Sequence, residues 1–590
     1  MKKLLDLISE ELAKAFEAAG YDASLGKATW SNRPDLCEIQ CNGAMAGAKL
    51  YKKAPIMIAN DVASKLGDSN TVTDVEAVAP GFLNMNISES FLTGYVEKMG
   101  EADKFGFESV KSDKIIIDYG GPNVAKPLHV GHLRSAVIGQ CIKNLCIYVG
   151  NDVTGDIHLG DWGLQMGLIM TELRHRKPEL PYFNESFTGE YPKESPFTLA
   201  ELEEIYPAAS AKSKADEKYK EEAMNDTFML QKGEKGRVAI WKHIMALSIP
   251  DLKKNYENLN VSFELWKGES DTGEIINDMV EGIKAGGFAY ESEGALVVDV
   301  KEESDTKEIP PCMLLKSDGA ALYTTTDLAT LDLRRKLYDP DRVIYVVDKR
   351  QEMHFTQVFR CAKKTGIVRE DTKLDFLGFG TMNGKDGKPF KTREGGVMRL
   401  EILLNDINEE MYKKITDNRE VDEKEARDTA KIVALAAVKY GDLSNQATKD
   451  YIFDVDKFTS FEGNTGPYIL YTIVRIKSIL AKYVSLGKNA DDAKLYFDEQ
   501  GCSKQQKNLM IGLTRFCAAI ESAYDELAPN KICAYIYDLA NSFNSFYHET
   551  KIITEEDAKK QEGYIALLVI VKRVLEDCIS ILGFSAPEKM

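Results

Sequence analysis

The stretch of sequence that decides the fold lies at residues 115–135 and reads I-I-I-D-Y-G-G-P-N-V-A-K-P-L-H-V-G-H-L-R-S. Its three isoleucines form a short apolar run typical of a buried strand, and the run ends in a loop rich in glycine and proline. Apolar residues at helical spacing follow from Leu128 to Val149, and a second strand pattern begins at Asp152. This order of strand, loop, helix and strand predicts the start of a parallel α/β sheet.

Later segments extend this domain. Apolar runs at 295–300, 343–347 and 374–380 fit further strands of the same doubly wound sheet. Residues 174–236 are polar, with four prolines before residue 200 and a long charged run after it, so we expect a helical insertion there. The whole α/β domain is predicted to span 111–400.

The two ends of the chain have different patterns. Residues 1–110 open with an amphipathic helix and continue with short apolar pieces between turn residues, which predicts a small α+β domain. Beyond residue 405 strand signals vanish and long segments with helical periodicity predict an all-helical bundle over 401–590. The apolar set of the first helix is Leu4, Leu5, Ile8, Leu12, Ala15 and Phe16.

Length and composition exclude several classes of protein. With 590 residues the chain is too long for a small binding module, and 44% hydrophobic with 28% charged residues is a globular composition. No run of 18 apolar residues exists, and Asp6, Glu10 and Glu11 interrupt any signal-peptide core. We therefore expect a cytoplasmic protein without a membrane segment.

Cysteine spacing and charge limit metals and partners. None of the ten cysteines forms a C-x-x-C pair, so we expect reduced thiols. Cys37 and Cys41 lie close together, but no second pair completes four ligands, and we predict no zinc and no other metal held by the protein. The net charge of −18 is spread along the chain and disfavours non-specific coating of nucleic acid, yet it leaves room for a local RNA site.

His129, Gly131 and His132 lie where the predicted helix begins. Two imidazoles and free backbone N–H groups at a helix N-terminus face whatever anion docks there, which suits the phosphates of a nucleotide. Two structural histidines with satisfied hydrogen bonds are the alternative for so short a motif. The wider sequence context bears on this choice.

H-V-G-H at 129–132 matches the H-I-G-H signature of class I aminoacyl-tRNA synthetases, which follows the first strand of a Rossmann-like fold. The longer string over 118–135 resembles the version in the arginyl-tRNA synthetase family. The resemblance extends from about residue 113 to 590, with further blocks in the family's order. These similar blocks are G-D-W-G at 160–163 with Gln165, G-E-S at 268–270, K-S-D-G at 316–319, Y-T-T-T-D at 323–327, Q-E-M-H-F at 351–355, F-K-T-R-E-G-G at 390–396 and E-G-N-T-G-P-Y at 462–468.

The resemblance implies a Rossmann-like parallel-sheet catalytic domain, an N-terminal α+β domain that contacts the tRNA elbow, and a C-terminal helical domain that binds the anticodon. It implies a monomeric enzyme that makes arginyl-adenylate from ATP and L-arginine and transfers arginine to the 3′-terminal adenosine of tRNA(Arg). The alternative is a catalytically inactive scaffold that binds tRNA or arginine, although the intact H-V-G-H argues against it. A small nucleotidylyltransferase with the same signature is excluded, since the helical bundle has no role there.

A guanidinium group presents five donors in a planar fork, so a site that selects arginine needs carboxylates and an acceptor in a closed pocket. By resemblance, Glu269, Tyr323 and Asp327 bind the guanidinium group. Taken singly, each could be a surface aspartate or a core tyrosine. The residues expected at the α-amino end of arginine are Asn123 and Gln351, with Asp118 and His129 beside them.

Activation brings the arginine carboxylate to the α-phosphate of ATP, and cations and donors must meet the charge that builds on phosphorus. We expect His129, Gly131 and His132 to bind ATP and the two histidines to act in catalysis. Mg²⁺ is expected on the phosphates, with no protein cage for it.

The family's second signature, K-M-S-K-S, is replaced here by F-K-T-R-E at 390–394. The resemblance implies that Lys391 and Thr392 bind ATP and that Lys391 and Arg393 act in catalysis. In arginyl enzymes with this departure, the lysine just upstream of H-I-G-H is thought to compensate, and here that residue is Lys126. A solvated loop lysine is the alternative.

Aromatic residues of the predicted bundle could stack unpaired bases of the anticodon loop. Most of them are nevertheless expected in the core, and no base-reading residue is predicted. The face expected to be buried comprises Tyr535, Leu539, Phe543 and Phe546.

Overall fold

A four-stranded parallel sheet lies at the centre of the molecule, in the order β11-β10-β5-β6. The structure is a computed structural model that describes residues 1–67, 69–184, 186–317, 319–388, 398–417, 421–496, 498 and 501–590. As predicted, a helix, α5 (Val130–Val149), connects the first two strands of the sheet. The strands are β5 (Lys114–Asp118), β6 (Asp152–Asp156), β10 (Arg342–Asp348) and β11 (Lys373–Phe379).

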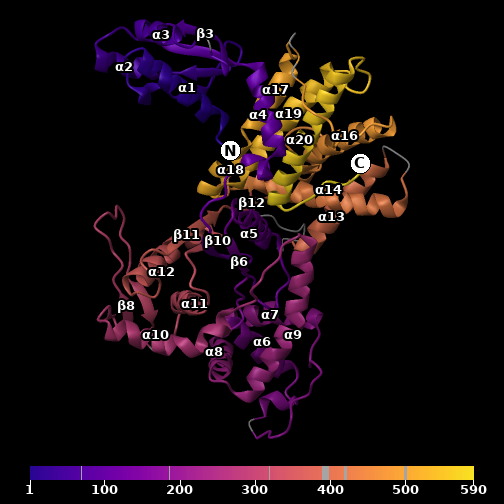
Figure 1. The fold of residues 1–590 in the computed structure, drawn as a ribbon. Helices are drawn as coiled ribbons and strands as arrows, with labels where there is room; N and C mark the ends of the chain where they lie inside the picture. The colour runs from indigo at the N-terminus through magenta and orange to yellow at the C-terminus, as the bar shows by residue number, and fades with distance from the viewer. Residues whose placement is uncertain are drawn as a thin grey trace.

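Both faces of this sheet are covered, which explains why its strands are apolar at successive positions. Ile115 and Ile117 of β5 pack into the core that contains α5, whereas Ile116 packs into a second core on the other face. The helices of that second core are α10 (Gly273–Ala285), α11 (Tyr323–Tyr338) and α12 (Glu352–Lys364) (Figure 1).

The expectation that residues 295–300 join the parallel sheet is wrong. They contribute to a separate antiparallel sheet of β7 (Ala289–Ser292), β8 (Ala295–Val298) and β9 (Cys312–Leu315). Glu293 and Gly294 connect β7 to β8 with φ angles of 52° and 82°, the left-handed conformations that a tight hairpin turn needs. A short apolar run looks the same in either kind of sheet, so only the turn distinguishes them.

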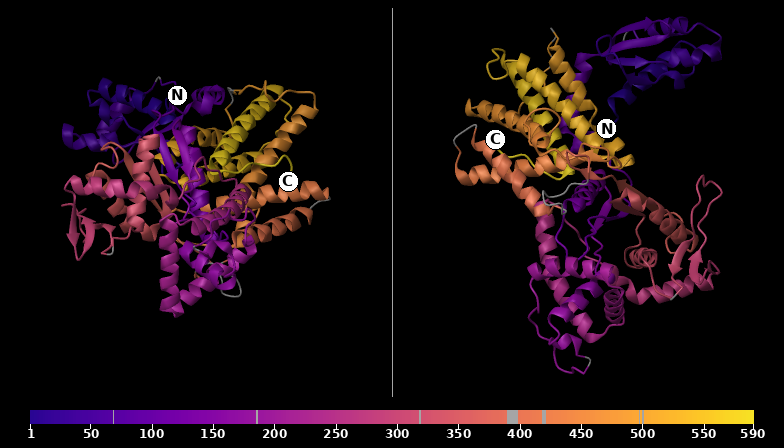
Figure 2. Two further views of the ribbon diagram at one scale, coloured as in Figure 1. Left: turned by 90° about the horizontal axis from the view of Figure 1, so that it is seen from below. Right: turned by 180° about the vertical axis from the view of Figure 1, so that it is seen from behind.

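A block of helices follows β6. α7 begins at a capping box in which the Thr198 hydroxyl accepts from the Glu201 backbone and the Glu201 carboxylate accepts from the Thr198 backbone. Figures 1 and 2 show this block at the opposite end of the molecule from the N-terminal domain. Its elements are α6 (Leu164–Arg176), η3 (Pro181–Phe183), α7 (Leu199–Ala215), α8 (Glu217–Gln231) and α9 (Lys235–Asn258).

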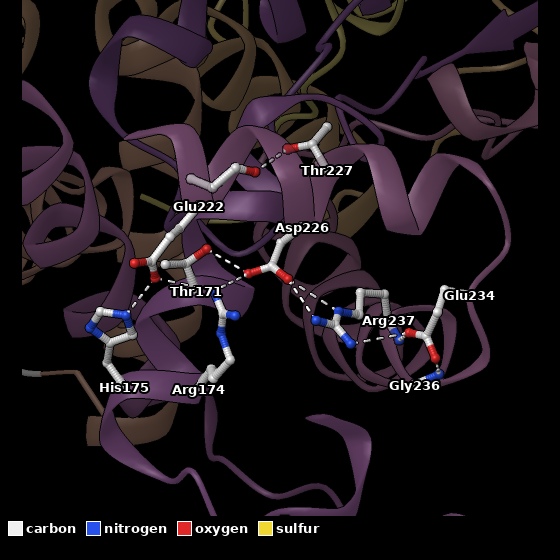
Figure 3. Close-up of polar contacts among 10 residues, drawn as sticks. Thr171, Arg174, His175, Glu222, Asp226, Thr227, Glu234, Gly236 and Arg237 are labelled. Carbon is white, nitrogen blue, oxygen red and sulfur yellow. Dashed lines mark hydrogen bonds and ion pairs between the residues drawn. The ribbon is translucent and has the colours of Figure 1, made fainter. Parts of the chain in front are cut away.

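A buried carboxylate ties three of these helices together (Figure 3). Asp226 of α8 is fully buried and accepts from the Thr171 hydroxyl at 2.7 Å and from Arg174 Nη2 at 3.0 Å, both on α6. From α9, Arg237 donates to Asp226 through Nη2 at 2.9 Å and Nε at 3.1 Å. Because each lone charge would be costly to bury, this network fixes the helices relative to one another.

The N-terminal domain is an antiparallel sheet covered by helices. The sheet has the order β1-β2-β4-β3, and the first helix buries the predicted residues Leu4, Ile8, Leu12, Ala15 and Phe16, with Leu5 only half-buried. The elements are α1 (Leu4–Ala18), η1 (Ala23–Leu25), β1 (Ala28–Trp30), β2 (Ile39–Cys41), α2 (Gly43–Tyr51), α3 (Pro55–Ala63), β3 (Val72–Val78) and β4 (Phe82–Ile87).

The C-terminal part is helical apart from the short strand β13, which pairs with β12 of the preceding segment. The predicted buried face of α19 is confirmed, because Tyr535 is 8% exposed and Leu539, Phe543 and Phe546 are 1% exposed or less. The elements are β12 (Met382–Asn383), α13 (Leu400–Thr416), α14 (Glu423–Leu443), β13 (Tyr451–Ile452), α15 (Val455–Phe458), α16 (Gly466–Ser485), α17 (Lys504–Thr514), α18 (Phe516–Asp525), α19 (Pro529–Glu549) and α20 (Ala558–Leu582).

Helix α4 (Glu89–Glu101) joins the N-terminal domain to this bundle and is followed by η2 (Asp103–Gly106). Arg573 of α20 donates to the Gly100 carbonyl at 2.7 Å, and the Glu89 carboxylate accepts from the Cys502 backbone at 2.9 Å. The ribbon shows α4 alongside the C-terminal helices (Figure 1). Within the described residues, no helix is both long and apolar enough to span a bilayer.

Candidate active site

The loops that follow β5 and β6 meet at the carboxyl edge of the sheet, where α/β folds bind ligands. Asp118 and Asp156, the last residues of the two strands, are partners in the parallel register. Arg334 of α11 is buried between them, and its Nη2 lies 2.6 Å from Asp118 Oδ2 and 2.7 Å from Asp156 Oδ2. Its Nη1 donates to the Tyr345 hydroxyl of β10 at 2.9 Å. One guanidinium group therefore links three neighbouring strands of the sheet.

His129 and His132 form the cap of α5. His129 Nδ1 accepts from the Gly131 backbone at 3.0 Å, and His132 Nδ1 accepts from the His129 backbone at 3.2 Å. A Cβ atom at Gly131 would lie 2.7 Å from His129 Cε1, so the close approach requires glycine. Because both Nδ1 atoms accept, both rings carry their proton on Nε2, which leaves two N–H donors for a ligand.

The charge state of these rings suits a donor role at neutral pH. Burial and the nearby Lys126 ammonium lower the pKa of His129. Burial, the His129 ring and Lys126 lower the pKa of His132 to about 3. Both imidazoles are therefore neutral at pH 7 and act as hydrogen-bond donors rather than as cations.

The chain downstream of the second signature lies directly beside the first. Met398 and Leu400 form backbone hydrogen bonds with Val130 at 3.1 Å and Leu128 at 2.9 Å, and Arg399 pairs with His129 as an antiparallel bridge. Residues 398–400, downstream of the second signature, thus lie next to His129. Three predicted residues of that signature, Lys391, Thr392 and Arg393, lie outside the described residues.

Lys126 lies in the loop before His129, and its Nζ is 4.0 Å from the centre of the Tyr206 ring of α7. This distance is typical of a cation–π contact. The ammonium group also depresses the pKa of both signature histidines, after burial. The structure therefore brings Lys126 to the predicted ATP side.

The three residues predicted to bind the guanidinium group lie together. Glu269 begins η4 (Glu269–Thr272), whereas Tyr323 and Asp327 lie on the first turns of α11. Burial raises the pKa of Glu269 to about 7, and the nearby carboxylates of Asp161 and Asp327 add to the rise. Tyr323 is 73% exposed, so its hydroxyl is open to a ligand.

Asp327 is oriented by a neighbour on α12. His354 Nε2 lies 2.5 Å from Asp327 Oδ2, and both side chains are about a quarter exposed or less. The block Q-E-M-H-F thus supplies a histidine that fixes a pocket carboxylate. Sequence reasoning missed this role because the two residues are 27 positions apart.

The residues predicted at the α-amino end have different surroundings. Asn123 is exposed, forms a parallel bridge with Gly160, and its Oδ1 would lie 2.3 Å from a Cβ atom at Gly160. Gln351 is exposed at the end of η5 (Lys349–Gln351), after β10. Asp118 differs from both, because it is buried and its carboxylate pairs with Arg334.

Two further polar residues follow β6, in the block D-I-H-L-G-D-W-G. His158 has a left-handed φ of 42°, and its buried Nδ1 has no hydrogen-bond partner. Asp161 is buried and accepts from the Ser270 hydroxyl at 2.6 Å and the Ser270 backbone at 3.0 Å. Burial raises the pKa of Asp161 and of Glu269, and the His158 ring opposes both rises. Their position at the carboxyl end of a strand is the signal that could have found them.

Comparison with known proteins agrees with this geometry. The family described as tRNA synthetases class I (R), catalytic domain, matches residues 97–455. The chain belongs to the arginyl-tRNA synthetase family. The Arginyl tRNA synthetase N terminal domain matches residues 2–87, and the DALR anticodon binding domain matches residues 469–590.

Relatives match over their full length. The chain is 63% identical to the arginine–tRNA ligase of Agathobacter rectalis over 598 residues and 54% identical to that of Alkaliphilus oremlandii over 591 residues, with 100% of each chain covered. Among solved structures, the arginyl-tRNA synthetase of Plasmodium falciparum aligns with a TM-score of 0.78 at 24% identity, covering 99% of each chain. That of Thermus thermophilus aligns with a TM-score of 0.76 at 21% identity, covering 99% of this chain and 100% of the other. The predicted family, fold class and enzyme class are confirmed.

Proposed function

We propose that the chain attaches L-arginine to tRNA(Arg) in two steps at the carboxyl edge of the β11-β10-β5-β6 sheet. The observation that carries this proposal is the grouping of Glu269 with Tyr323 and Asp327 beside the loop after β6, at the sheet edge where the H-V-G-H donors begin α5. A guanidinium pocket beside a phosphate site is what arginine activation requires.

In the pocket, Glu269, Asp327 and the Tyr323 hydroxyl receive the guanidinium group. A planar fork of five donors can satisfy carboxylates and a hydroxyl in different directions at once. The ammonium group of lysine would leave part of this set unpaired, at about 1–3 kcal/mol for each unsatisfied buried group. Selection of arginine over lysine follows from that difference.

At the other end of the substrate, Asn123 and Gln351 contact the α-amino group. Both side chains are exposed at the sheet edge and free to take up a ligand. Asp118 does not contact the substrate directly in this proposal, because its carboxylate is already paired with Arg334. His129 lies at the junction between the two substrates.

In the first step the arginine carboxylate oxygen attacks the α-phosphorus of ATP. A bond forms between these atoms, the bond to the bridging oxygen breaks, and pyrophosphate leaves with the electron pair. The Nε2–H groups of His129 and His132 and the Lys126 ammonium meet the developing charge, while Gly131 lets the phosphates approach. Lys391, Thr392 and Arg393 are proposed to complete the site from the second signature.

Mg²⁺ would accompany ATP and neutralise charge on the phosphates. The described residues hold no group of three or more histidine, cysteine, aspartate or glutamate side chains that could bind a metal ion. In this proposal the phosphate oxygens supply most of its ligands. In the second step, a ribose hydroxyl of the terminal adenosine, the 2′-hydroxyl by resemblance to the class, attacks the arginyl carbonyl and AMP leaves.

The tRNA is proposed to contact all three regions, with its elbow at 1–110, its acceptor end at 111–400 and its anticodon at 401–590. One feature of the helical region suits an unpaired base. Arg475 Cζ of α16 lies 4.7 Å from the centre of the Tyr471 ring and 5.0 Å from that of the Tyr547 ring, and both tyrosines are exposed. A cation grouped with exposed aromatic rings suits the stacking of single-stranded RNA bases.

One chain contributes every residue of the proposed site, and we propose that it works as a monomer in the cytoplasm. The variant His132→Ala tests the catalytic proposal. Arginine charging is expected to fall about 10²-fold or more, the scale of losing one transition-state donor, whereas tRNA binding measured by filter retention should persist. Full charging by this variant would contradict the assignment. Equal loss of charging and binding would point to misfolding, which a melting curve detects.

A further inference from the structure

One turn of α7 contacts the residue three positions before H-V-G-H and a residue just downstream of the second signature. Tyr206 places its ring 4.0 Å from Lys126 Nζ, and Glu203 Oε2 lies 2.7 Å from Arg399 Nη2. Residues three apart on a helix share a face, so both contacts arise from the same surface of α7. Lys126 precedes His129 by three positions, and Arg399 bridges the His129 backbone.

We propose that Tyr206 is a positioning residue that holds the Lys126 ammonium beside the signature histidines for arginine activation. This inference rests on the proposed catalytic role of Lys126. It adds a residue from the helical block, 80 positions away in sequence, to the machinery that prepares the ATP side.

The chemistry of the contact explains why an aromatic ring is suitable. A lysine side chain has about 2 kcal/mol of rotamer entropy, so an unrestrained ammonium group would seldom lie at the phosphate position. A carboxylate partner would restrain it, but it would occupy the N–H donors and repel the phosphates. The face of a tyrosine attracts the cation without accepting its hydrogen bonds, and it adds no charge to the site.

The surroundings agree with a positioning role. Lys126 adds to burial in depressing the pKa of His129 and His132, which places its charge close to both rings.

Helix α7 is itself firmly anchored. Lys212 near its C-terminal end donates to both oxygens of the buried Glu172 of α6, at 2.9 and 2.8 Å. Near its N-terminal end, Glu201 pairs with Lys177 at 3.0 Å. Asp226 in turn fixes α6 to α8 and α9 (Figure 3). A ring carried by α7 thus has a defined place relative to the sheet edge.

The test is pyrophosphate exchange with saturating tRNA, ATP and arginine, measured for four variants. Y206L removes the π-face and should lower kcat about 5- to 10-fold, the scale of one cation–π contact near a desolvated site. Y206F keeps the face and should stay within about twofold of the parent. K126M should lower kcat about 10²-fold, and the double variant Y206L/K126M should be no slower than K126M alone.

A matched control and melting curves separate positioning from general damage. Phe228 of α8 also lies under a lysine, Lys232 at 4.5 Å, and is 50% exposed, so F228L should leave kcat unchanged. Losses that multiply in Y206L/K126M, or a Y206F enzyme as slow as Y206L, would overturn the inference and leave the role of Lys126 standing. A K126M enzyme with parental kcat would overturn both.

Discussion

The pH dependence of arginine binding tests the guanidinium pocket most closely, because Glu269 attracts the substrate only as a carboxylate. Burial raises its pKa to about 7, so about one site in eleven is ionised at pH 6 and about ten in eleven at pH 8. Protonation at lower pH removes the charge that arginine needs. KM for arginine should therefore rise about tenfold from pH 8 to pH 6.

The substitution Glu269→Gln should change activity and stability in opposite directions. Leaving a substrate cation without its buried partner costs about 2–5 kcal/mol, so kcat/KM should fall by about 30-fold or more and lose its pH dependence over this range. Stability follows from the sign of the shift. The pKa of Glu269 in the folded chain lies above its unfolded value of about 4.5, so its favourable contribution is present below pH 4.5 and is lost as pH rises through 7.

At pH 8 this pKa shift lowers the free energy of unfolding by at most about 3 kcal/mol, and solvent screening of the half-buried side chain reduces that value. The Glu269→Gln protein should therefore melt at a higher temperature than the parent at pH 8, with the difference vanishing near pH 4.5. Initial charging rates at several arginine concentrations between pH 6 and 8, with calorimetry, measure both effects. Asp271→Asn is the control, since Asp271 lies on the same turn and pairs with Lys267 at 2.9 Å. A parent KM that is flat with pH, or a glutamine variant that melts lower, would refute the reasoning.

Two further predictions concern the frame of the site and the tRNA. Arg334→Met leaves two buried carboxylates unpaired and should lower the free energy of unfolding by about 3–5 kcal/mol in urea titrations, whereas Arg350→Met at an exposed pair should change it by less than about 1 kcal/mol. Equal losses of stability in the two variants would contradict the proposal that Arg334 holds the strands together. Tyr547→Ala removes one face of the stack on Arg475 and should raise KM for tRNA about 5- to 100-fold, with arginine KM unchanged. An unaltered KM for tRNA would exclude this platform.

Much of the fold could be predicted because its signals are local. The periodicity after Leu128 identifies α5, and the spacing from Leu4 to Phe16 identifies α1, since each helix carries its own apolar face. The prediction for residues 295–300 is wrong because the four consecutive apolar residues of β8 fit a parallel or an antiparallel sheet equally well.

The site was predictable where a motif sets local geometry and not where partners meet in space. The His129 ring lies so close to Gly131 that it leaves no room for a side chain there, and both residues belong to the four-residue motif H-V-G-H. The contact of Lys126 with Tyr206 joins residues 80 positions apart, and the pairing of Asp118 with Arg334 joins residues 216 apart. Neither contact can be predicted from the spacing of residues or from composition, so each is seen only in the tertiary structure.

The most direct test of the central claim is to charge total tRNA with each labelled amino acid in turn, with ATP and Mg²⁺ at low salt. Arginine alone should be esterified, and the Glu269→Gln variant should lose that charging while it still binds tRNA. Charging with another amino acid, or none with arginine by a folded protein that binds tRNA, would contradict the assignment of the Glu269 pocket and the H-V-G-H site to arginine activation.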